Sequence, residues 1–155
     1  MAEEWIGTHT DMFAKGEGVS FAITLRETKK LVGSIGLEIS KEHSRAELGY
    51  WIGKLFWGQG FATEAARALL HHGFQVLNLH RIYAHHLTRN PASGRVMAKL
   101  GMSHEGKLRQ HMMKWDVFED VEVWGVLRGD TSHIASADFS PGVDSVSSRL
   151  NDCKH

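Results

Sequence analysis

The sequence predicts one domain of the α/β (α+β) class, in which a mixed, largely antiparallel sheet is flanked by helices. Three observations predict this class. Apolar segments on both sides of a short polar turn, over residues 19–40, are typical of an antiparallel hairpin. An amphipathic helix over 62–77 is followed directly by a strand, which indicates one parallel crossover. A longer hairpin over 105–128 closes the domain.

The first elements are expected to be a helix over residues 1–16 and then three strands. Acidic residues in its first turn favour the helix. The strands lie in 19–40, on both sides of the polar turn RETKK, and in 45–53. In the third strand, side-chain alternation puts Leu48 on one face and Glu47 on the other.

Helix and strand then alternate. Apolar residues over 62–77 recur at the i, i+3, i+4, i+7 spacing, which predicts a helix with one buried stripe. The segment HRIYAHHLT, residues 80–88, is expected to be a strand parallel to the third one. The next helix has clear ends, with Asn90 as its N-cap, Pro91 at its first position and Gly101 as its stop.

The last part of the chain divides into a hairpin and a tail. The hairpin is expected to turn at DVFE, residues 116–119. Residues 131–155 contain six serines and show no sustained periodicity, which indicates a disordered tail after a domain that spans 1–130.

Composition limits the classes of partner. The 18 basic side chains are balanced by 18 acidic ones, which argues against a nucleic-acid partner because such proteins usually carry a basic excess or a basic face. Cys153 is the only cysteine, so no internal disulfide can form and a reducing, cytoplasmic setting is expected. No apolar run approaches the roughly 18 residues that span a membrane, and the N-terminus lacks a signal-peptide pattern, so no membrane partner is expected.

Two glycines, Gly58 and Gly60, stand directly before the first periodic helix in FWGQGFATEAARALL. The first N–H groups of a helix lack partners within it, and the helix dipole adds positive charge there, so a phosphate is favoured where no Cβ blocks its approach. A tight turn from strand to helix would use the same glycines, and both interpretations remain open at this point. A dinucleotide fingerprint is disfavoured, because Thr63 stands where its third glycine should be.

Four segments in this order resemble a known family: RAELGYWIG, WGQGFATEAARALL, RNPASGRVMAKLGM and EGKLRQHMMKWDVFEDVEVWGVLR. Over roughly residues 1–130 the chain resembles the GCN5-related N-acetyltransferase (GNAT) family, and more narrowly its branch of ribosomal-protein alanine and serine acetyltransferases. In that family a loop written Q/R-x-x-G-x-G/A holds the pyrophosphate of acetyl-coenzyme A with its backbone amides; here Trp57 replaces the Gln or Arg. The resemblance implies that acetyl-coenzyme A is bound by Gly58, Gln59, Gly60, Phe61, Ala62, Thr63, Asn90 and Arg95.

The resemblance also implies a reaction, the direct transfer of acetyl from the thioester to a primary amine. Glu47 lies where similar enzymes carry a proposed base, with Glu38 on the neighbouring strand as the reserve. Met97 stands where many relatives have a tyrosine and cannot donate a proton, and Ser93 matches the serine that this branch carries as a proposed acid. Each residue also has a plainer interpretation: Glu47 as a solvated strand residue, Ser93 as an ordinary first-turn residue, Asn90 as a cap and Arg95 as a solvated arginine.

Histidines outside these motifs are given structural or surface roles, and aromatic residues outside them are given packing roles. The 11 histidines include neither an HExxH pattern nor a pairing with cysteine at ligand spacing, so no metal is expected. We expect Trp115, Phe118 and Trp124 on the closing hairpin to belong to the core or to the wall of the substrate site.

In one respect the sequence departs from the family, which normally carries a further strand and helix before the helix that opens this chain. We therefore expect a truncated core whose cofactor binding survives better than its catalysis, and an uncovered strand edge that favours a homodimer. The acceptor would be an amine, either a protein N-terminus or a small molecule. The alternative function is a non-catalytic acyl-coenzyme A-binding module or a truncated remnant of such an enzyme.

Overall fold

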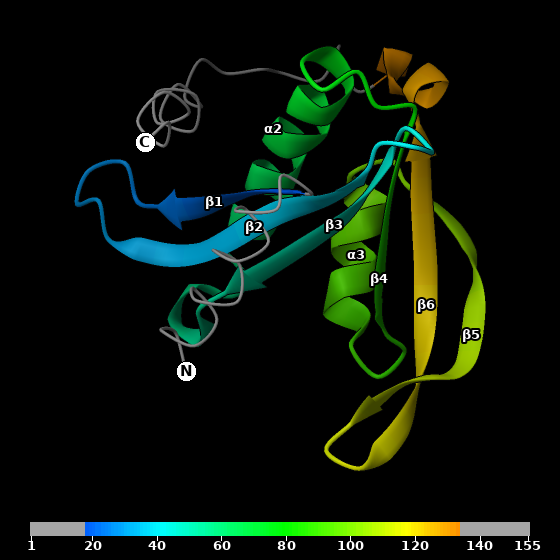
Figure 1. Cartoon of the computed structure of the whole chain (residues 1–155). Coiled ribbons are helices and arrows are strands. Elements are labelled where there is room, and N and C mark those ends of the chain that lie inside the picture. Colours follow the sequence, from blue (N-terminus) through cyan, green and yellow to red (C-terminus); the bar gives the residue numbers. More distant parts are fainter. Residues whose placement is uncertain (1–17, 134–155) are drawn as a thin grey trace.

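The computed structural model describes residues 18–133, which form a six-stranded sheet with two α-helices against it (Figure 1). The helix expected over 1–16 lies outside the described residues, as does all of the expected tail beyond His133. In chain order the elements are β1 (Gly18–Thr24), β2 (Leu31–Ser40), β3 (Arg45–Ile52), the 3₁₀ helix η1 (Lys54–Phe56), α2 (Phe61–Gln75), β4 (Arg81–Leu87), α3 (Pro91–Lys99), β5 (Ser103–Lys114), β6 (Val117–Leu127) and the 3₁₀ helix η2 (Arg128–His133).

The strands lie in the order β1-β2-β3-β4-β6-β5. Every neighbouring pair is antiparallel except β3 with β4, which are parallel and joined through α2. This arrangement confirms the mixed, largely antiparallel sheet that the sequence predicts. In the register of β2 and β3, Leu37 lies opposite Leu48 and Glu38 lies opposite Glu47. The apolar residues of the two strands therefore share one face of the sheet and the glutamates share the other.

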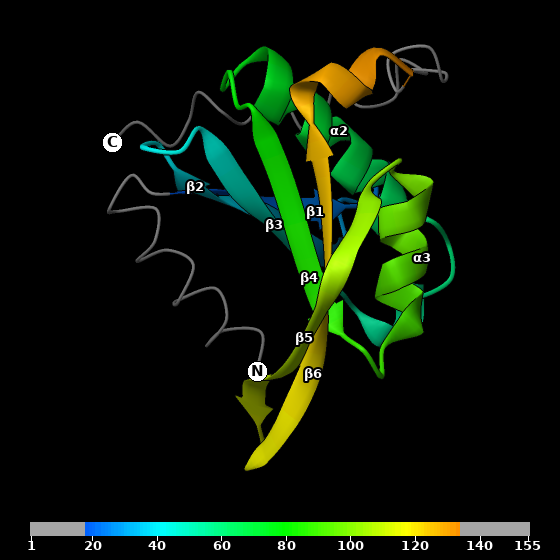
Figure 2. The same cartoon turned by 90° about the vertical axis from the view of Figure 1, so that its right-hand side faces the viewer.

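Helices α2 and α3 lie on the same side of the sheet (Figure 2). The apolar stripe of α2 faces the sheet, because its buried residues recur at the spacing of one helix face. Burial of each large side chain contributes about 1.5–3 kcal/mol to folding. The core cluster comprises Ile35, Leu37, Ala46, Leu48, Ala66, Leu69, Leu70, Phe74, Leu79, Ile82, Ala84, Met97, Leu100, Met102 and Val126.

Strands β3 and β4 pair over only three residues, from Arg45 with Arg81 to Glu47 with Tyr83. Although β3 continues to Ile52, the two strands diverge past Glu47, as their ribbons show (Figure 1). On its other side β4 pairs with β6 along its whole length. Both α-helices therefore begin just beyond the carboxyl ends of two diverging strands, where α/β sheets commonly bind ligands.

The closing hairpin corrects the sequence prediction in one detail. Its turn lies at Trp115 and Asp116 instead of residues 116–119, and Val117 already belongs to β6. Trp115 and Asp116 both adopt positive φ, 51° and 61°. Two such residues make the tight turn whose twist matches that of paired strands, so Lys114 pairs directly with Val117.

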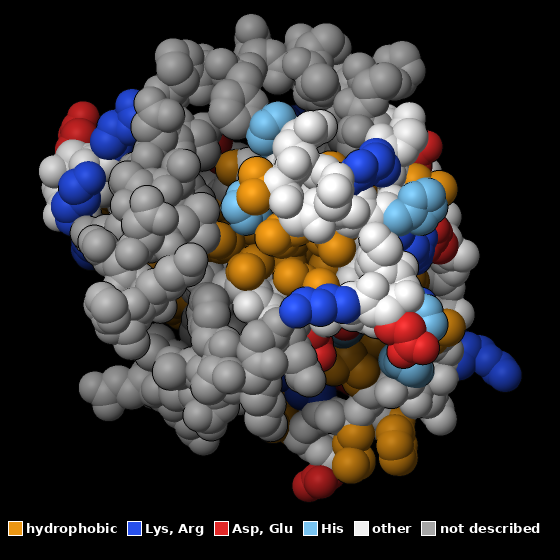
Figure 3. Space-filling model, turned by 45° about the horizontal axis from the view of Figure 1, so that its top comes forward, with side chains coloured by type: hydrophobic (Ala, Val, Ile, Leu, Met, Phe, Trp, Pro, Cys, Tyr) orange, Lys and Arg blue, Asp and Glu red, His pale blue; other side chains and the backbone are white. Residues whose placement is uncertain are grey.

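The described surface agrees with the balanced composition. Figure 3 shows one face on which acidic, basic, histidine and apolar side chains are interspersed. Within residues 18–133, no helix is long and apolar enough to cross a membrane.

Candidate active site

The glycine loop leaves open space in front of α2. Gly60 is the N-cap residue, with φ of 82°, and Gly58 has φ of 72°, a region that side-chain-bearing residues rarely adopt. A Cβ built on either glycine would meet no atom within 4 Å. The N–H groups of the first helical turn, residues 61–63, have no acceptor within the helix. The loop thus has the form of a cradle that an anion could enter.

The other residues predicted for the cofactor fall into two groups. Gln59, Phe61, Ala62 and Thr63 lie with the glycines at the start of α2, and the Phe61 ring contacts Phe56 edge-on at 6.1 Å between centroids. Nε1 of Trp57 donates to the carbonyl of Ile52 at 2.8 Å, which fixes the loop to the end of β3. Asn90 is the N-cap residue of α3 and Arg95 lies on this helix, which contacts α2.

Ser93 lies at the centre of a short hydrogen-bond network at the start of α3. Its Oγ accepts from the hydroxyl of Tyr50 at 3.2 Å and from Nδ2 of Asn90 at 3.1 Å. Asn90 holds the N-cap position as predicted, but its side chain makes no capping hydrogen bond, because its amide is turned to Ser93. Burial raises the pKa of Tyr50, against a smaller opposite effect of its bond to Ser93. No pattern in the sequence predicts that Tyr50 on β3 contacts Ser93.

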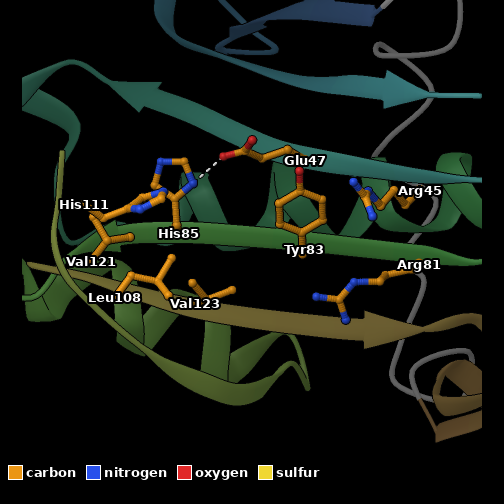
Figure 4. A pocket seen from close by; sticks show the side chains of 9 residues that line it. All are labelled: Arg45, Glu47, Arg81, Tyr83, His85, Leu108, His111, Val121 and Val123. Atoms are coloured by element: carbon orange, nitrogen blue, oxygen red, sulfur yellow. Dashed lines mark ion pairs between the residues drawn. The ribbon is translucent and has the colours of Figure 1, made fainter. Parts of the chain in front are cut away.

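Glu47 belongs to a different place, a pocket on the sheet face opposite the helices. The pocket has a volume of about 380 Å³. Figure 4 shows polar side chains of β3 and β4 along one side, and Leu108, Val121 and Val123 of β5 and β6 with His111 of β5 along the other. The residues that line it are Arg45, Glu47, Arg81, Tyr83, His85, Leu108, His111, Val121 and Val123.

Within this pocket Glu47 is paired with His85. Nδ1 of His85 is in contact with Oε1 of Glu47, and the two side chains are 35% and 26% exposed (Figure 4). The hydrogen bond to Glu47 raises the pKa of His85 above its ordinary value, against the opposing effect of burial. Glu38, the reserve candidate, is exposed on β2 directly opposite Glu47. His85 was expected to have only a structural or surface role, and its contact with Glu47 is what the sequence missed.

The far end of the pocket is basic. Both terminal nitrogens of Arg81 contact the Glu105 carboxylate, and its guanidinium lies 5.4 Å from the centre of the Tyr83 ring. The hydrogen bonds from Arg81 hold the pKa of Glu105 below its ordinary value. Arg81 is therefore a fixed part of the wall, whereas Arg45 makes no ion pair with any residue of 18–133.

The remaining histidines and aromatic residues separate into packed and exposed ones. Trp124 packs against the core and donates from Nε1 to Nε2 of His86 at 3.1 Å, so both fulfil the expected structural role. Trp115 and Phe118 do not belong to the core, because they are exposed at the tip of the closing hairpin, and neither lines the pocket beside Glu47. No group of three or more His, Cys, Asp or Glu that could hold a metal ion occurs in the part of the chain that the structure describes.

Comparison with known proteins gives the same family by sequence and by fold. The model of the family described as "Acetyltransferase (GNAT) domain" matches residues 1–103. The chain is 36% identical over 124 residues to the N-acetyltransferase YoaA of Bacillus subtilis (strain 168), covering 79% of this chain and 70% of that protein. It is 33% identical over 96 residues to the ribosomal-protein-serine acetyltransferase of Escherichia coli (strain K12), covering 61% of this chain and 54% of that protein.

Solved structures agree. A mutant form of the spermidine N-acetyltransferase SpeG from Vibrio cholerae matches with a TM-score of 0.75 at 25% identity, covering 86% of this chain and 79% of that one. The diverging β3 and β4, the glycine loop before α2 and these matches all point to one conclusion. The chain belongs to the GNAT acetyltransferase family and is an N-acetyltransferase, with relatives in the ribosomal-protein-serine branch.

Proposed function

We propose that the protein transfers the acetyl group of acetyl-coenzyme A to a primary amine by direct attack of the amine on the thioester. The observation that carries the proposal is the cradle at Gly58 and Gly60, which is open where a Cβ would stand and lies at the N-terminus of a 15-residue helix. Exposed N–H groups and the helix dipole both favour a pyrophosphate there. The residues present therefore fit this co-substrate.

Two sets of residues would hold acetyl-coenzyme A. The backbone N–H groups of Gly58 and of residues 59–63 would donate to the pyrophosphate. Gln59 and Thr63 would therefore bind it through their main chain. Asn90 would contact the pantetheine arm, since the strands β3 and β4 diverge just before α3 begins. Arg95 is exposed on α3 and would approach a phosphate.

Ser93 would assist the leaving sulfur. A hydroxyl can accept two hydrogen bonds and donate one. Because Tyr50 and Asn90 both donate to Ser93, its own proton remains to be donated to a third group, such as a developing thiolate. Tyr50 would position this hydroxyl. Met97 is buried in the core and has no proton to give.

Glu47 would act on the amine side of the reaction. It lies at the last paired position of β3 with β4, beside the pocket that could receive the acceptor. An ammonium must lose its proton before it can attack, and an α-amine with a pKa of about 8 loses it far more easily than a lysine amine near 10.4. A carboxylate in a partly shielded pocket attracts the ammonium, and it would support the deprotonation either as the general base or through a neighbouring group.

The acceptor is proposed as a class only. The matched proteins include a spermidine N-acetyltransferase and a ribosomal-protein-serine acetyltransferase by name. We accordingly propose either a small-molecule amine or a protein N-terminus. The alternative, a non-catalytic acyl-coenzyme A-binding module, shares the glycine cradle and differs only in turnover. As a further partner we propose a second copy of the chain, because apolar side chains are exposed at the tip of the closing hairpin.

The test combines calorimetry with thiol release. Titration with acetyl-coenzyme A should show binding, and the same sample should release coenzyme A thiol when given a suitable amine from a panel of spermidine, amino-acid amides and short peptides. Binding without turnover on any amine would favour the module. No binding at all would leave Gly58 and Gly60 as a turn.

A glycine variant makes the binding test specific. Gly60→Ala places a methyl group in the cradle, and we expect it to weaken acetyl-coenzyme A binding about tenfold or more. Gly101→Ala is the matched control, because Gly101 has a similar φ of 78° at the end of α3 and so suffers the same backbone strain. Equal losses in both variants would show that strain, and not the cradle, decides binding.

A further inference from the structure

We propose that Nε2 of His85 takes the proton from the acceptor amine, and that Glu47 is a positioning residue that orients the imidazole. The inference rests on the proposed acetyl transfer and assigns its proton acceptor. It starts from the contact between Nδ1 of His85 and Oε1 of Glu47 in the pocket on the open face of the sheet.

Strand register explains why these two residues meet. Tyr83 is the last residue of β4 that pairs with β3, and its partner is Glu47. His85 is two residues further along, so its side chain leaves the same face just where the strands begin to diverge (Figure 4). There the imidazole extends toward β3 and contacts the carboxylate of Glu47. The imidazole therefore lines the pocket in which the proposed acceptor would be bound.

The contact also sets the tautomer of His85. A carboxylate bonded to Nδ1 keeps a proton on that nitrogen, and the neutral ring then has its lone pair on Nε2. The same division of roles, in which a carboxylate orients a histidine that moves the proton, operates in hydrolytic triads. With its oxygen already occupied by an N–H group, Glu47 is the poorer proton acceptor of the two.

Basicity leads to the same assignment. The ordinary pKa of a glutamate, about 4.3, lies more than three units below that of an α-amine, whereas that of a histidine, about 6.5, lies within two. Each unit corresponds to a tenfold difference in proton affinity, so the imidazole removes the proton more readily. The hydrogen bond to Glu47 raises the pKa of His85 further, and burial opposes it.

Other groups in the pocket would act on His85 at longer range. The strand β6 presents valines to the pocket and no charge. The titratable and charged groups that face His85 are Arg45 and Glu47 on β3, Arg81 and Tyr83 on β4 and His111 on β5, with Glu38 on β2 opposite Glu47. Arg81 is already paired with Glu105, so the contact with Glu47 is the main short-range interaction.

The step balances as follows. The acceptor enters as R–NH3⁺ and gives one proton to Nε2 of His85, which later releases it to water. The neutral nitrogen forms the C–N bond with the thioester carbonyl carbon, and the C–S bond breaks. The nitrogen loses a second proton as the amide forms, and the sulfur gains one, so the products are the N-acetyl amine, coenzyme A thiol and one proton.

The test compares pH profiles of variants at the pair. His85→Ala should lower kcat by about 10²- to 10⁴-fold while acetyl-coenzyme A affinity stays unchanged, and added imidazole should restore part of the rate. Glu47→Gln should cause a smaller loss and move the acidic limb of kcat/KM to lower pH, because the pKa of His85 falls without its partner. His43→Ala and Glu42→Gln, exposed in the β2–β3 turn, are the matched controls and should behave as wild type.

A second measurement is independent of turnover. The imidazole C–H resonances of His85, followed by NMR in the protein without acetyl-coenzyme A, should titrate at lower pH in Glu47→Gln than in wild type. A His85→Ala enzyme that keeps the wild-type acidic limb, or that loses less activity than Glu47→Gln, would overturn the inference and return the base to Glu47. Wild-type protein that turns over no amine would overturn the proposed function itself.

Discussion

His85 and Glu47 resemble other half-exposed strand residues until the register of β3 and β4 brings them together. Each alone would be a solvated polar side chain. In the pair, the carboxylate favours the charged imidazole and so raises the pKa of His85. The same holds for Ser93, an ordinary first-turn serine until Tyr50 and Asn90 fill both of its lone pairs.

The raised pKa of His85 has a consequence for stability that does not depend on catalysis. A group whose folded pKa lies above its unfolded value contributes stability that is complete below the unfolded pKa, about 6.5, and is lost as pH rises through the folded pKa. We therefore expect Glu47→Gln to destabilise the protein at pH 5.5 and to have little effect at pH 8.5. The difference should stay below about 1 kcal/mol, because the pair is partly solvated.

Urea unfolding at the two pH values measures this difference. Glu42→Gln, in the exposed turn after β2, serves as the control and should show no such dependence. A destabilisation by Glu47→Gln that grows from pH 5.5 to pH 8.5 would contradict the direction of the shift.

At the scale of elements, the divergence of β3 and β4 arranges the site. Glu47 and His85 lie on one face of the sheet and Tyr50 and Ser93 on the other, because side chains alternate along a strand, and both pairs lie at or beyond the last paired residues. The divergence requires that the rest of the sheet be held firmly. On the β4 side this is achieved by full-length pairing with β6, whose end is fastened to α2 by Arg128.

Arg128 should contribute more to the free energy of unfolding than an ordinary exposed arginine. Its guanidinium donates to the carbonyls of Phe74 at 2.6 Å and Leu79 at 3.0 Å, and to Oδ1 of Asn78 at 2.9 Å. It thereby satisfies carbonyls at and beyond the C-terminal end of α2, where a cation also complements the helix dipole. We expect Arg128→Ala to lower the free energy of unfolding by about 2–3 kcal/mol.

Chemical denaturation tests this expectation. Arg128→Lys should recover little, because an ammonium cannot reproduce the fork of N–H donors. Arg26→Ala, exposed in the β1–β2 turn, should change stability by less than about 0.5 kcal/mol. An equal effect of Arg128→Ala and Arg26→Ala would show that the link between β6 and α2 is unimportant.

At the scale of the whole molecule, the surface is uneven. The β5–β6 hairpin projects beyond the rest of the sheet (Figures 1 and 2). Its tip exposes Met113 by 62%, Trp115 by 82% and Phe118 by 61%, and Met113 lies opposite Phe118 in the register. A cluster of exposed apolar side chains of this kind usually marks an interaction surface. A second copy of the chain is the partner that we propose.

Sedimentation at tens of micromolar tests the homodimer. Wild-type protein should associate, and the double variant Met113→Lys/Phe118→Lys should sediment as a monomer because two charges replace the apolar pair at the tip. Val76→Lys is the control, since Val76 is also exposed but lies at the end of α2. A wild-type protein that remains a monodisperse monomer at this concentration would contradict the proposal.

Local patterns in the sequence predicted the strands and helices of the described region well. Period-two alternation and polar turns predicted β1, β2 and β3, and helical periodicity with Pro91 and Gly101 predicted α2 and α3. The turn at Trp115 and Asp116 was misplaced because Trp115, its first residue, is bulky and residues of this kind rarely adopt a positive φ. The position of the glycine loop before α2 could be predicted from the sequence because it depends on neighbouring residues, whereas its role as a phosphate cradle stays a prediction.

The sequence by itself determined the element order, the mixed sheet and the position of the glycine loop, since these follow from side-chain periodicity and local backbone preference. Only the tertiary structure decided which polar groups meet. The contact of His85 with Glu47 depends on the register of a parallel pair joined through a helix, and that of Tyr50 with Ser93 depends on how α3 docks beside β3. Neither register nor docking is encoded within a short window, because both are set by packing of residues far apart in the chain.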